Sequence, residues 1–194
     1  TVSLSMLNFA KAVWNLVIGL IISIYLLASK ERFVSQGKKL LYAFWDTRQA
    51  NVIMEDFRLI DSTFGGFISG KILDSSIIGV LCFVVVSIMK MPYPMLISVI
   101  VGVTNIIPFF GPFIGAVPCA LLILMVNPMQ CLYFIIFIWI LQQFDGNFLG
   151  PKILGDSTGL SGFWIIFSIT IFSGLMGVPG MILGVPIFAV FYAL

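Results

Sequence analysis

The stretch Asn105 to Pro118, "NIIPFFGPFIGAVP", combines three prolines and two glycines with a complete absence of charged residues. The nearest charged residues along the chain are Lys90 and Asp145. Proline removes a backbone donor and interrupts a helix, and long uncharged segments are typical of protein in contact with lipid. The stretch therefore predicts a helix that is broken inside a membrane.

The composition of the whole chain agrees with a membrane environment. Of its 194 residues, 60% are hydrophobic and 9% are charged, whereas a soluble domain carries about 25% charged residues. So much apolar surface indicates that the lipid bilayer is the main partner of the protein. We expect an all-α, polytopic transmembrane helical protein that forms a single transmembrane domain over residues 1–194.

The charge pattern divides this domain into segments. Thirteen charged residues, seven of them Lys or Arg, lie between Lys30 and Asp74, where apolar residues recur every three or four positions. We expect two amphipathic helices in residues 30–71, either on the membrane surface or as plain connections, and the positive-inside rule places them in the cytoplasm. Ordinary spans are expected over residues 8–28, 72–89 and 129–146.

Two long uncharged runs are each interrupted by glycine and proline. Residues 91–144 contain no charge, and the break near Pro108 leaves arms of 13 and 14 residues, about 20 Å each at 1.5 Å per residue. Residues 160–194 are broken at "GLMGVPG", residues 174–180. Because such arms are too short to cross ~30 Å of hydrocarbon comfortably, we expect re-entrant, hairpin-like elements over residues 95–126 and 162–194. "PFIGAVPCALLIL" and "GMILGVPIFAVFYAL" also read as an internal repeat, although membrane proteins are generally rich in Gly and Pro.

Several functional classes fit the sequence poorly. The chain has no histidine, which excludes a Ser-His protease and a His-ligated metal site. An aspartyl protease needs two aspartates that share a proton, and only Asp145 and Asp156 are candidates. Three cysteines in apolar runs do not predict disulfides, and we expect no metal, cofactor or nucleic-acid partner.

Polar groups near the first break are candidates for binding a solute. Irregular backbone within a membrane is tolerated where it is buried in protein or lines a water-filled cavity. The break frees backbone groups near residues 104–112, and an alternative role for Asn105 is to cap the hairpin turn. The candidate residues here are Thr104, Asn105, Pro108, Gly111 and Pro112.

A second polar group follows the apolar helix over residues 129–146. Asp145 is the carboxylate beside that helix, and an ionisable residue in a membrane is a functional candidate with Lys152 as its expected partner. The alternative is an interfacial Asp145–Lys152 ion pair that closes a loop. The candidates are Gln142, Gln143, Asp145, Asn147 and Lys152, together with Gly177 and Pro179 at the second break.

Three motifs in this order resemble the autoinducer-2 exporter family of bacterial membrane proteins: "GVTNIIPFFGPFIGAVP", "QQFDGNFLGPKILG" and "GVPGMILGVPIFAVF". The resemblance covers nearly the whole chain. It implies the bacterial cytoplasmic (inner) membrane and export of the furanone signal autoinducer-2, or sodium/proton antiport as in some members. The family often has Glu at the position of Asp145 and a "GLHP"-like element where this chain has "GLSG" (residues 159–162), so no proton-coupling role is carried over to that element.

We therefore expect a secondary-type transporter or exporter of a small polar solute, similar to autoinducer-2, through a site built by broken helices. The alternatives are a monovalent cation/proton antiporter that uses Asp145 and a membrane scaffold that transports nothing. Small residues in the spans are compatible with a homo-oligomer. The chain starts without methionine directly before a hydrophobic segment, so we expect further residues to precede it.

Overall fold

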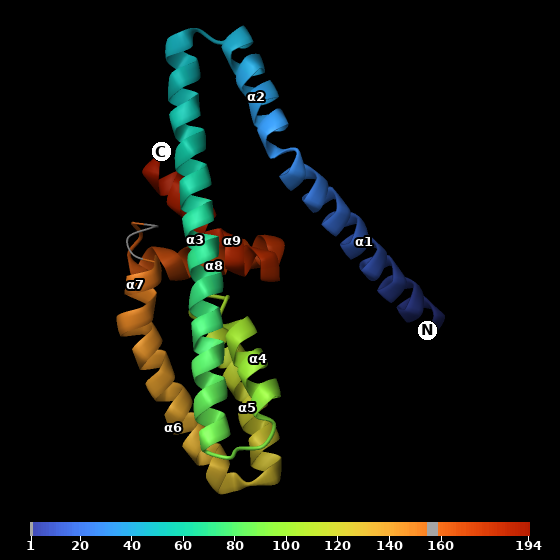
Figure 1. Cartoon of the computed structure of the whole chain (residues 1–194), viewed down its shortest axis with the longest axis vertical. Helices are drawn as coiled ribbons and strands as arrows, with labels where there is room; N and C mark the ends of the chain where they lie inside the picture. Colours follow the sequence, from blue (N-terminus) through green and yellow to red (C-terminus); the bar gives the residue numbers. More distant parts are fainter. Residues whose placement is uncertain (1, 155–158) are drawn as a thin grey trace. The chain divides into compact units, whose positions relative to one another are not determined.

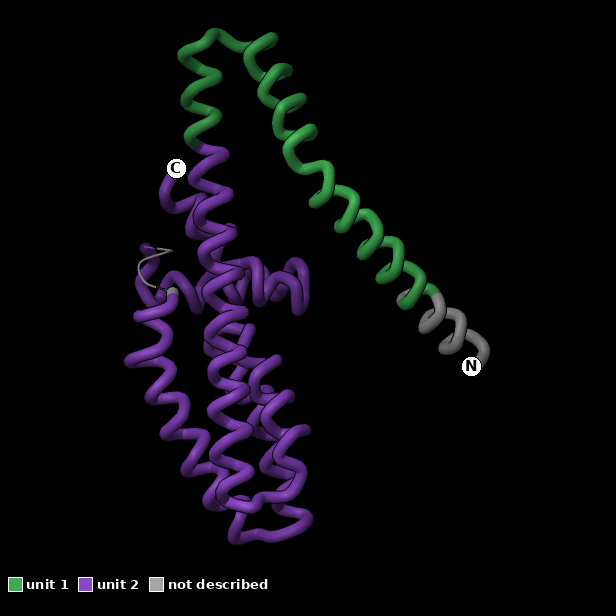
Figure 2. The backbone as a smooth tube through the Cα atoms, viewed as in Figure 1, with its two compact units in different colours: residues 1–55 green, residues 56–194 purple. Residues whose placement is uncertain are grey.

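The computed structural model describes residues 2–154 and 159–194 (Figure 1). Asp156, the second aspartate considered above, lies outside these residues. Every secondary-structure element assigned in the described residues is a helix, which confirms the all-α class. The chain divides into two compact units, Thr1–Glu55 and Asp56–Leu194 (Figure 2).

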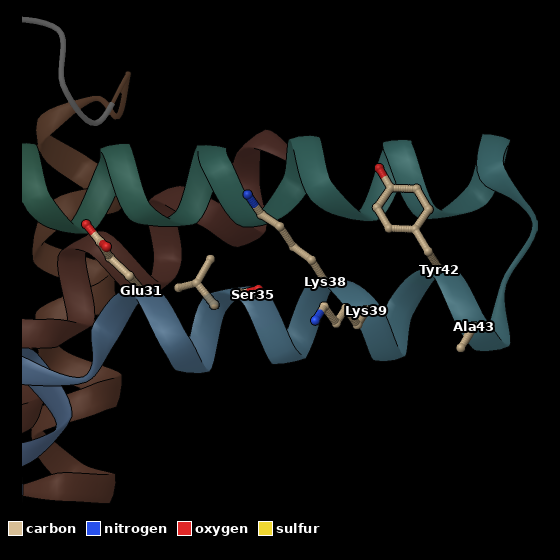
Figure 3. Close-up of a pocket in the computed structure, with 7 residues that line it drawn as sticks. Glu31, Ser35, Lys38, Lys39, Tyr42 and Ala43 are labelled. Atoms are coloured by element: carbon tan, nitrogen blue, oxygen red, sulfur yellow. The ribbon is translucent and has the colours of Figure 1, made fainter.

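The first unit contains α1 (Val2–Ala28), α2 (Lys30–Phe44) and the beginning of α3 (Thr47–Ile88). The described part of α1 from Val13 onward and α2 form a bent pair with an angle of 69°. Along α2 runs an open hollow lined by Glu31, Val34, Ser35, Lys38, Lys39, Tyr42 and Ala43 (Figure 3). All of these residues come from one helix, none of the residues of α2 is buried, and the hollow therefore has the character of a surface rather than of an enclosed binding site.

Helix α3 is longer than any single element expected from the sequence. It runs for 42 residues without proline, about 63 Å at 1.5 Å per residue and twice the ~30 Å thickness of the hydrocarbon layer. The expected change from an amphipathic segment (30–71) to a span (72–89) is a change of composition within one continuous helix. Lys71 and Asp74 consequently lie in the interior of one helix, on the two sides of the expected boundary between residues 71 and 72.

Helices α4 (Pro94–Thr104) and α5 (Gly111–Val126) form the first hairpin. The break between them contains Phe109, whose φ of 62° is in the left-handed region. Two glycines one turn apart let α5 approach α4 closely: a Cβ on Gly111 would collide with the carbonyl oxygen of Thr104, and one on Gly115 with the Thr104 hydroxyl. The glycines thus serve the close packing of the hairpin.

Helices α8 (Gly162–Met176) and α9 (Val178–Ala193) form a second hairpin with the same device. The residue at its break, Gly177, has a φ of 64°. Gly180 and Gly184, again four residues apart at the start of the second arm, pack against Phe172 of the first arm, and a Cβ on Gly180 would collide with the Phe172 carbonyl oxygen. This shared pattern supports the internal repeat expected from the sequence.

In the sequence, α6 (Pro128–Phe144) lies between the two hairpins. It continues as a π-helical turn, η1 (Asp145–Leu149), and then as α7 (Gly150–Leu154). The loop assumed for the alternative Asp145–Lys152 ion pair is not found, because the chain stays helical from Asp145 to Leu154. The side chain of Asn147 donates to the carbonyl oxygen of Gln143 at 2.8 Å, which satisfies a backbone acceptor in the widened turn. Pro151 follows this turn, and because it has no N–H it cannot donate a hydrogen bond to the preceding helical turn.

Among the described residues, two helices are long and apolar enough to cross a membrane, α3 and the continuous segment Pro128–Ile153. The bent pair in the first unit adds a third if it is counted as one span. The arms of both hairpins are shorter apolar helices of 11 to 16 residues. Helices α3, α4, α5 and α6 share one core around the fully buried Phe134, and Phe67 of α3 packs with Ile169 and Val185 of the second hairpin.

Candidate functional site

A buried ion pair on α3 is the first component of the candidate site. Lys71 Nζ lies 2.8 Å from Asp74 Oδ2, and the two side chains are 9% and 0% exposed. The residues are three positions apart, so a helix places them on neighbouring turns of one face. Removing two charges from solvent costs several kcal/mol per ion unless they are paired and hydrogen-bonded, which explains why Lys71 and Asp74 occur together.

Asn105 joins this pair to the first hairpin. It follows the last residue of α4, and its side chain is 1% exposed. Its Nδ2 atom lies 3.3 Å from Asp74 Oδ2 and 3.5 Å from Asp145 Oδ2. Both distances exceed the ~2.9 Å typical of an N–H···O bond. One amide nitrogen is therefore shared between two carboxylates, neither of which it binds at the optimal distance.

Asp145 completes the contact with Asn105, although it lies 40 residues later in the sequence. It is the first residue of η1, and Gly150 N–H donates to its carbonyl oxygen five residues back, as a π-turn requires. Such turns insert a residue into a helix and occur often at functional sites. The inserted residue rotates the side chains that follow it relative to α6, at the place where Asp145 reaches the hairpin.

When both carboxylates are ionised and Lys71 is protonated, the four side chains leave one negative charge without a counter-charge. We call Lys71, Asp74, Asn105 and Asp145 the polar cluster: it has one ammonium group, two carboxylates and one neutral amide. Asp74 Oδ1 and Asp145 Oδ1 are buried and have no hydrogen-bond partner. Two neutral polar atoms are also buried without a hydrogen-bond partner. They are Oγ of Ser75, the residue after Asp74, and Nε2 of Gln142, one helical turn before Asp145. The cluster can thus offer several oxygen atoms and one net negative charge to a ligand.

The proximity of Asp74 and Asp145 corrects the reason given above against an aspartyl protease. Asp145 does have an aspartate neighbour, through Asn105, and it is Asp74 rather than Asp156. However, a protease dyad requires two carboxylates that share one proton. Here Asp74 already has Lys71 as its charged partner at 2.8 Å. The arrangement therefore resembles a binding site with one uncompensated carboxylate more than a catalytic dyad.

The expected partnership of Asp145 with Lys152 is not formed. Lys152 is exposed on α7, and the Lys71–Asp74 contact is the ion pair found among the described residues. Because residues 145–152 are helical rather than looped, the chain does not fold back to bring the two charges together. Gln143 and Asn147 are also exposed and hydrogen-bond to each other, so they lie apart from the polar cluster.

The remaining predicted residues belong to the two hairpins. The Thr104 hydroxyl donates to the carbonyl oxygen of Ile100 at 2.8 Å in its own helix. Pro108 is buried in the first break, whereas Gly177 is exposed in the second. Gly111 and Pro112 open α5, and Pro179 opens α9. Of all the residues predicted from the sequence, the structure brings together Asn105 and Asp145, with Gln142 nearby.

Lys71 and Asp74 are the site residues that the sequence analysis missed. Lys71 is the last residue of the segment expected in the cytoplasm (30–71), and Asp74 lies within the expected span 72–89, so neither stands out as a site residue in the sequence. One signal could have found them: "KILDSS" lies next to an apolar run and contains opposite charges at a spacing of three. Opposite charges at this spacing can neutralise each other in a buried helix.

The cluster lacks the donor set of a typical metal site. No group of three or more His, Cys, Asp or Glu side chains that could hold a metal ion occurs in the part of the chain that was described. Two carboxylate groups suit a proton or a weakly held monovalent cation, whereas calcium takes six to eight oxygen ligands.

Comparison with known proteins identifies the family. A family model described as "AI-2E family transporter" matches residues 2–194. The chain belongs to this family. The match confirms the resemblance drawn from the three motifs, and with the apolar helices it makes the chain part of a multi-pass bacterial membrane protein.

Curated relatives of this AI-2E family chain carry names of transport proteins. "Putative transport protein YueF" of Bacillus subtilis is 33% identical over 86% of the chain, and "Putative transport protein YrrI" of the same organism is 39% identical over 69%. A "Putative transport protein" of Haemophilus influenzae is 26% identical over 96%. The aligned regions cover 44%, 38% and 53% of these relatives, so the chain spans about half their length or less. No solved structure matches the chain.

Proposed function

We propose that this AI-2E family chain forms part of a secondary transporter in which the polar cluster binds a proton or a monovalent cation. The observation that carries the proposal is the shared contact of Asn105 Nδ2 with Asp74 and Asp145, next to a single Lys71. Membership of a transporter family supplies the general activity. The cluster supplies the chemistry of ion coupling.

The charge balance of the cluster favours a monovalent ligand. With both carboxylates ionised and Lys71 protonated, the cluster carries one net negative charge. A buried, unbalanced charge is expensive in a membrane protein, so the site is stable when a proton or a cation neutralises it. Exchange of one for the other at the same carboxylates would couple the two fluxes.

The hairpin gives this site a means of movement. Asn105 stands at the C-terminal end of α4, directly before the break that contains Phe109. Contacts of 3.3 and 3.5 Å tie this end of the hairpin to α3 and to η1. Neutralising the carboxylates weakens their attraction for the amide and would release the hairpin. We propose that α4–α5 and α8–α9 are re-entrant elements and that release of α4–α5 opens access to the site.

A second candidate function is export of an uncharged solute similar to autoinducer-2, as the family name suggests. Two neutral groups favour it, because Ser75 Oγ and Gln142 Nε2 are buried and have no partner. Such groups could bind hydroxyl or carbonyl groups of a sugar-like molecule. In this version the charged residues hold the helices in position, and the ion is not exchanged.

The location of the protein is part of the proposal. We place it in the bacterial cytoplasmic membrane, with residues 30–71 on the cytoplasmic side because of their basic residues. A homo-oligomer and a scaffold without transport activity are compatible with the family's membrane location, but no feature of the polar cluster requires either.

The test is flux in proteoliposomes made with the full-length protein. Asp145→Asn removes the charge with little change of shape, and Asp61→Asn, an exposed aspartate on α3, is the matched control. Ion coupling predicts that cation-driven proton flux falls by at least about tenfold in Asp145→Asn and is unchanged in Asp61→Asn. If uncharged-solute export persists in Asp145→Asn while no ion flux is seen in the wild type, the second candidate is correct instead.

A further inference from the structure

We propose that Lys71 sets the valence of the ion that the polar cluster accepts. Its ammonium group cancels one of two carboxylate charges, so the site takes one proton or one monovalent cation and rejects divalent cations. This inference rests on the proposed ion-binding function. It adds a specificity-determining residue to the site.

The contacts show which oxygen atoms Lys71 occupies. Its Nζ atom lies 2.8 Å from Asp74 Oδ2, the same oxygen that Asn105 Nδ2 contacts at 3.3 Å. The second oxygen, Asp74 Oδ1, is buried without a partner, and so is Asp145 Oδ1. Lys71 therefore neutralises Asp74 from one side while leaving an oxygen of each carboxylate available to a ligand.

No other positive charge contributes to this balance among the described residues of the second unit. Helices α4, α5, α8 and α9 contain no charged residue. The other basic residues of this unit, Arg58, Lys90 and Lys152, are exposed. Lys71 is 8% exposed and is the basic residue in contact with the cluster.

Electrostatics then relates the net charge to the valence of the ligand. A monovalent cation brings the cluster from one negative charge to neutrality. A divalent cation would leave it with one positive charge, in a buried setting where an unbalanced charge is unfavourable. Calcium also prefers six to eight oxygen ligands, and Lys71 occupies one of the few that this site has. Removing Lys71 makes the cluster more negative and frees an oxygen ligand, and both changes favour a divalent ion.

Four variants separate charge from other effects of substitution. Lys71→Gln raises the net charge of the cluster to two negative charges, and Asn105→Asp does the same without changing Lys71. Lys71→Arg keeps the wild-type charge. The double variant Lys71→Gln with Asp74→Asn returns the cluster to one negative charge. Lys152→Gln, at an exposed lysine, is the matched control.

The measurement is binding of radioactive ⁴⁵Ca²⁺ to the full-length protein in detergent, at fixed ionic strength in choline chloride. We expect Lys71→Gln and Asn105→Asp to bind Ca²⁺ at least about tenfold more tightly than the wild type, because one more negative charge acts at short range. Lys71→Arg, Lys152→Gln and the double variant should bind Ca²⁺ as weakly as the wild type.

The outcomes distinguish this inference from the proposed function. Wild-type affinity for Ca²⁺ in both variants with two negative charges would overturn the inference, and so would tight binding by the double variant. If Lys71→Gln does not fold, Asn105→Asp still decides the question. Failure of the proposed function would appear separately, as a wild-type protein without cation-driven proton flux. If Lys71→Gln and Asn105→Asp gain Ca²⁺ binding in that case, the inference that Lys71 sets the valence of the bound ion still holds.

Discussion

Asn105 and Asp145, 40 residues apart in the sequence, meet with Nδ2 and Oδ2 3.5 Å from each other. Asn105 ends the first arm of a hairpin, and Asp145 begins a π-turn in a membrane-length helix. The same amide nitrogen also contacts Asp74. This junction connects a broken helix to the two longest apolar helices of the second unit, and the predictions below follow from it.

Asp74→Asn should destabilise the protein strongly. The substitution leaves the Lys71 ammonium buried without its charged partner, and breaking a buried pair in this way costs about 3–5 kcal/mol. Asp61→Asn, on an exposed face of the same helix, should change the free energy of unfolding by no more than about 0.5 kcal/mol. Thermal unfolding in detergent, followed by circular dichroism, compares the two. Equal stability of both variants would show that Lys71 does not depend on Asp74.

The double variant Lys71→Met with Asp74→Leu should be more stable than Asp74→Asn alone. Replacing both members of a buried pair by apolar residues of similar size is often neutral or stabilising by about 1–4 kcal/mol. We therefore expect the double variant to recover the stability lost in Asp74→Asn and to lose ion-coupled transport. Stability and flux measured on the same preparation test this. Recovery of flux together with stability would mean that the ion pair is purely structural.

Alanine at Gly111 or Gly180 should weaken the corresponding hairpin. A Cβ at either position collides with a backbone carbonyl oxygen of the first arm, Thr104 or Phe172, and overpacking of this kind costs about 1–3 kcal/mol. Gly174→Ala is the control, because its Cβ would meet no atom within 4 Å and alanine is favoured over glycine in a helix by about 1 kcal/mol. Unfolding of the three variants should rank Gly174→Ala as the most stable. The reverse order would contradict the close packing described.

The two breaks should respond in opposite ways to a change at their residue of positive φ. Phe109 has a φ of 62° and Gly177 a φ of 64°. A left-handed conformation costs a non-glycine residue about 1–2 kcal/mol. Gly177, with a ψ of -138°, has a conformation that non-glycine residues rarely adopt, at a cost of about 1–3 kcal/mol. Phe109→Gly should relieve the first cost, and Gly177→Ala should introduce the second, which unfolding midpoints in detergent can measure. A loss of stability in Phe109→Gly would mean that contacts of the aromatic ring outweigh the backbone strain.

Part of this site could be predicted from the sequence, because composition alone indicates the membrane-embedded segments and the positions at which their helices are broken. Asn105 follows from its position beside prolines in an uncharged run, and Asp145 from being an ionisable residue next to an apolar helix. The two breaks that separate the arms of the hairpins follow from the placement of glycine and proline in uncharged runs. These are local properties of short segments.

The remainder depends on contacts that the local sequence does not encode. Lys71 and Asp74 look like ordinary members of a charged region until α3 is seen to continue unbroken past them. Lys152 was expected to pair with Asp145 because it is near in sequence, but helical geometry through η1 and α7 keeps the two apart. The π-turn itself has no sequence signature strong enough to distinguish it from a loop rich in Gly and Pro.

The most direct test of the central claim, that a proton and a monovalent cation compete for the polar cluster, is proton release on addition of Na⁺, Li⁺ or K⁺ to the full-length protein in weakly buffered detergent. With a pH-indicator dye, the account predicts release of up to about one proton per chain at some pH between about 5 and 9, because displacement of a bound proton is linked to cation binding. Release should be lost in Asp145→Asn and kept in Asp61→Asn. No release by the wild-type protein with any of the three cations across that range would contradict the account.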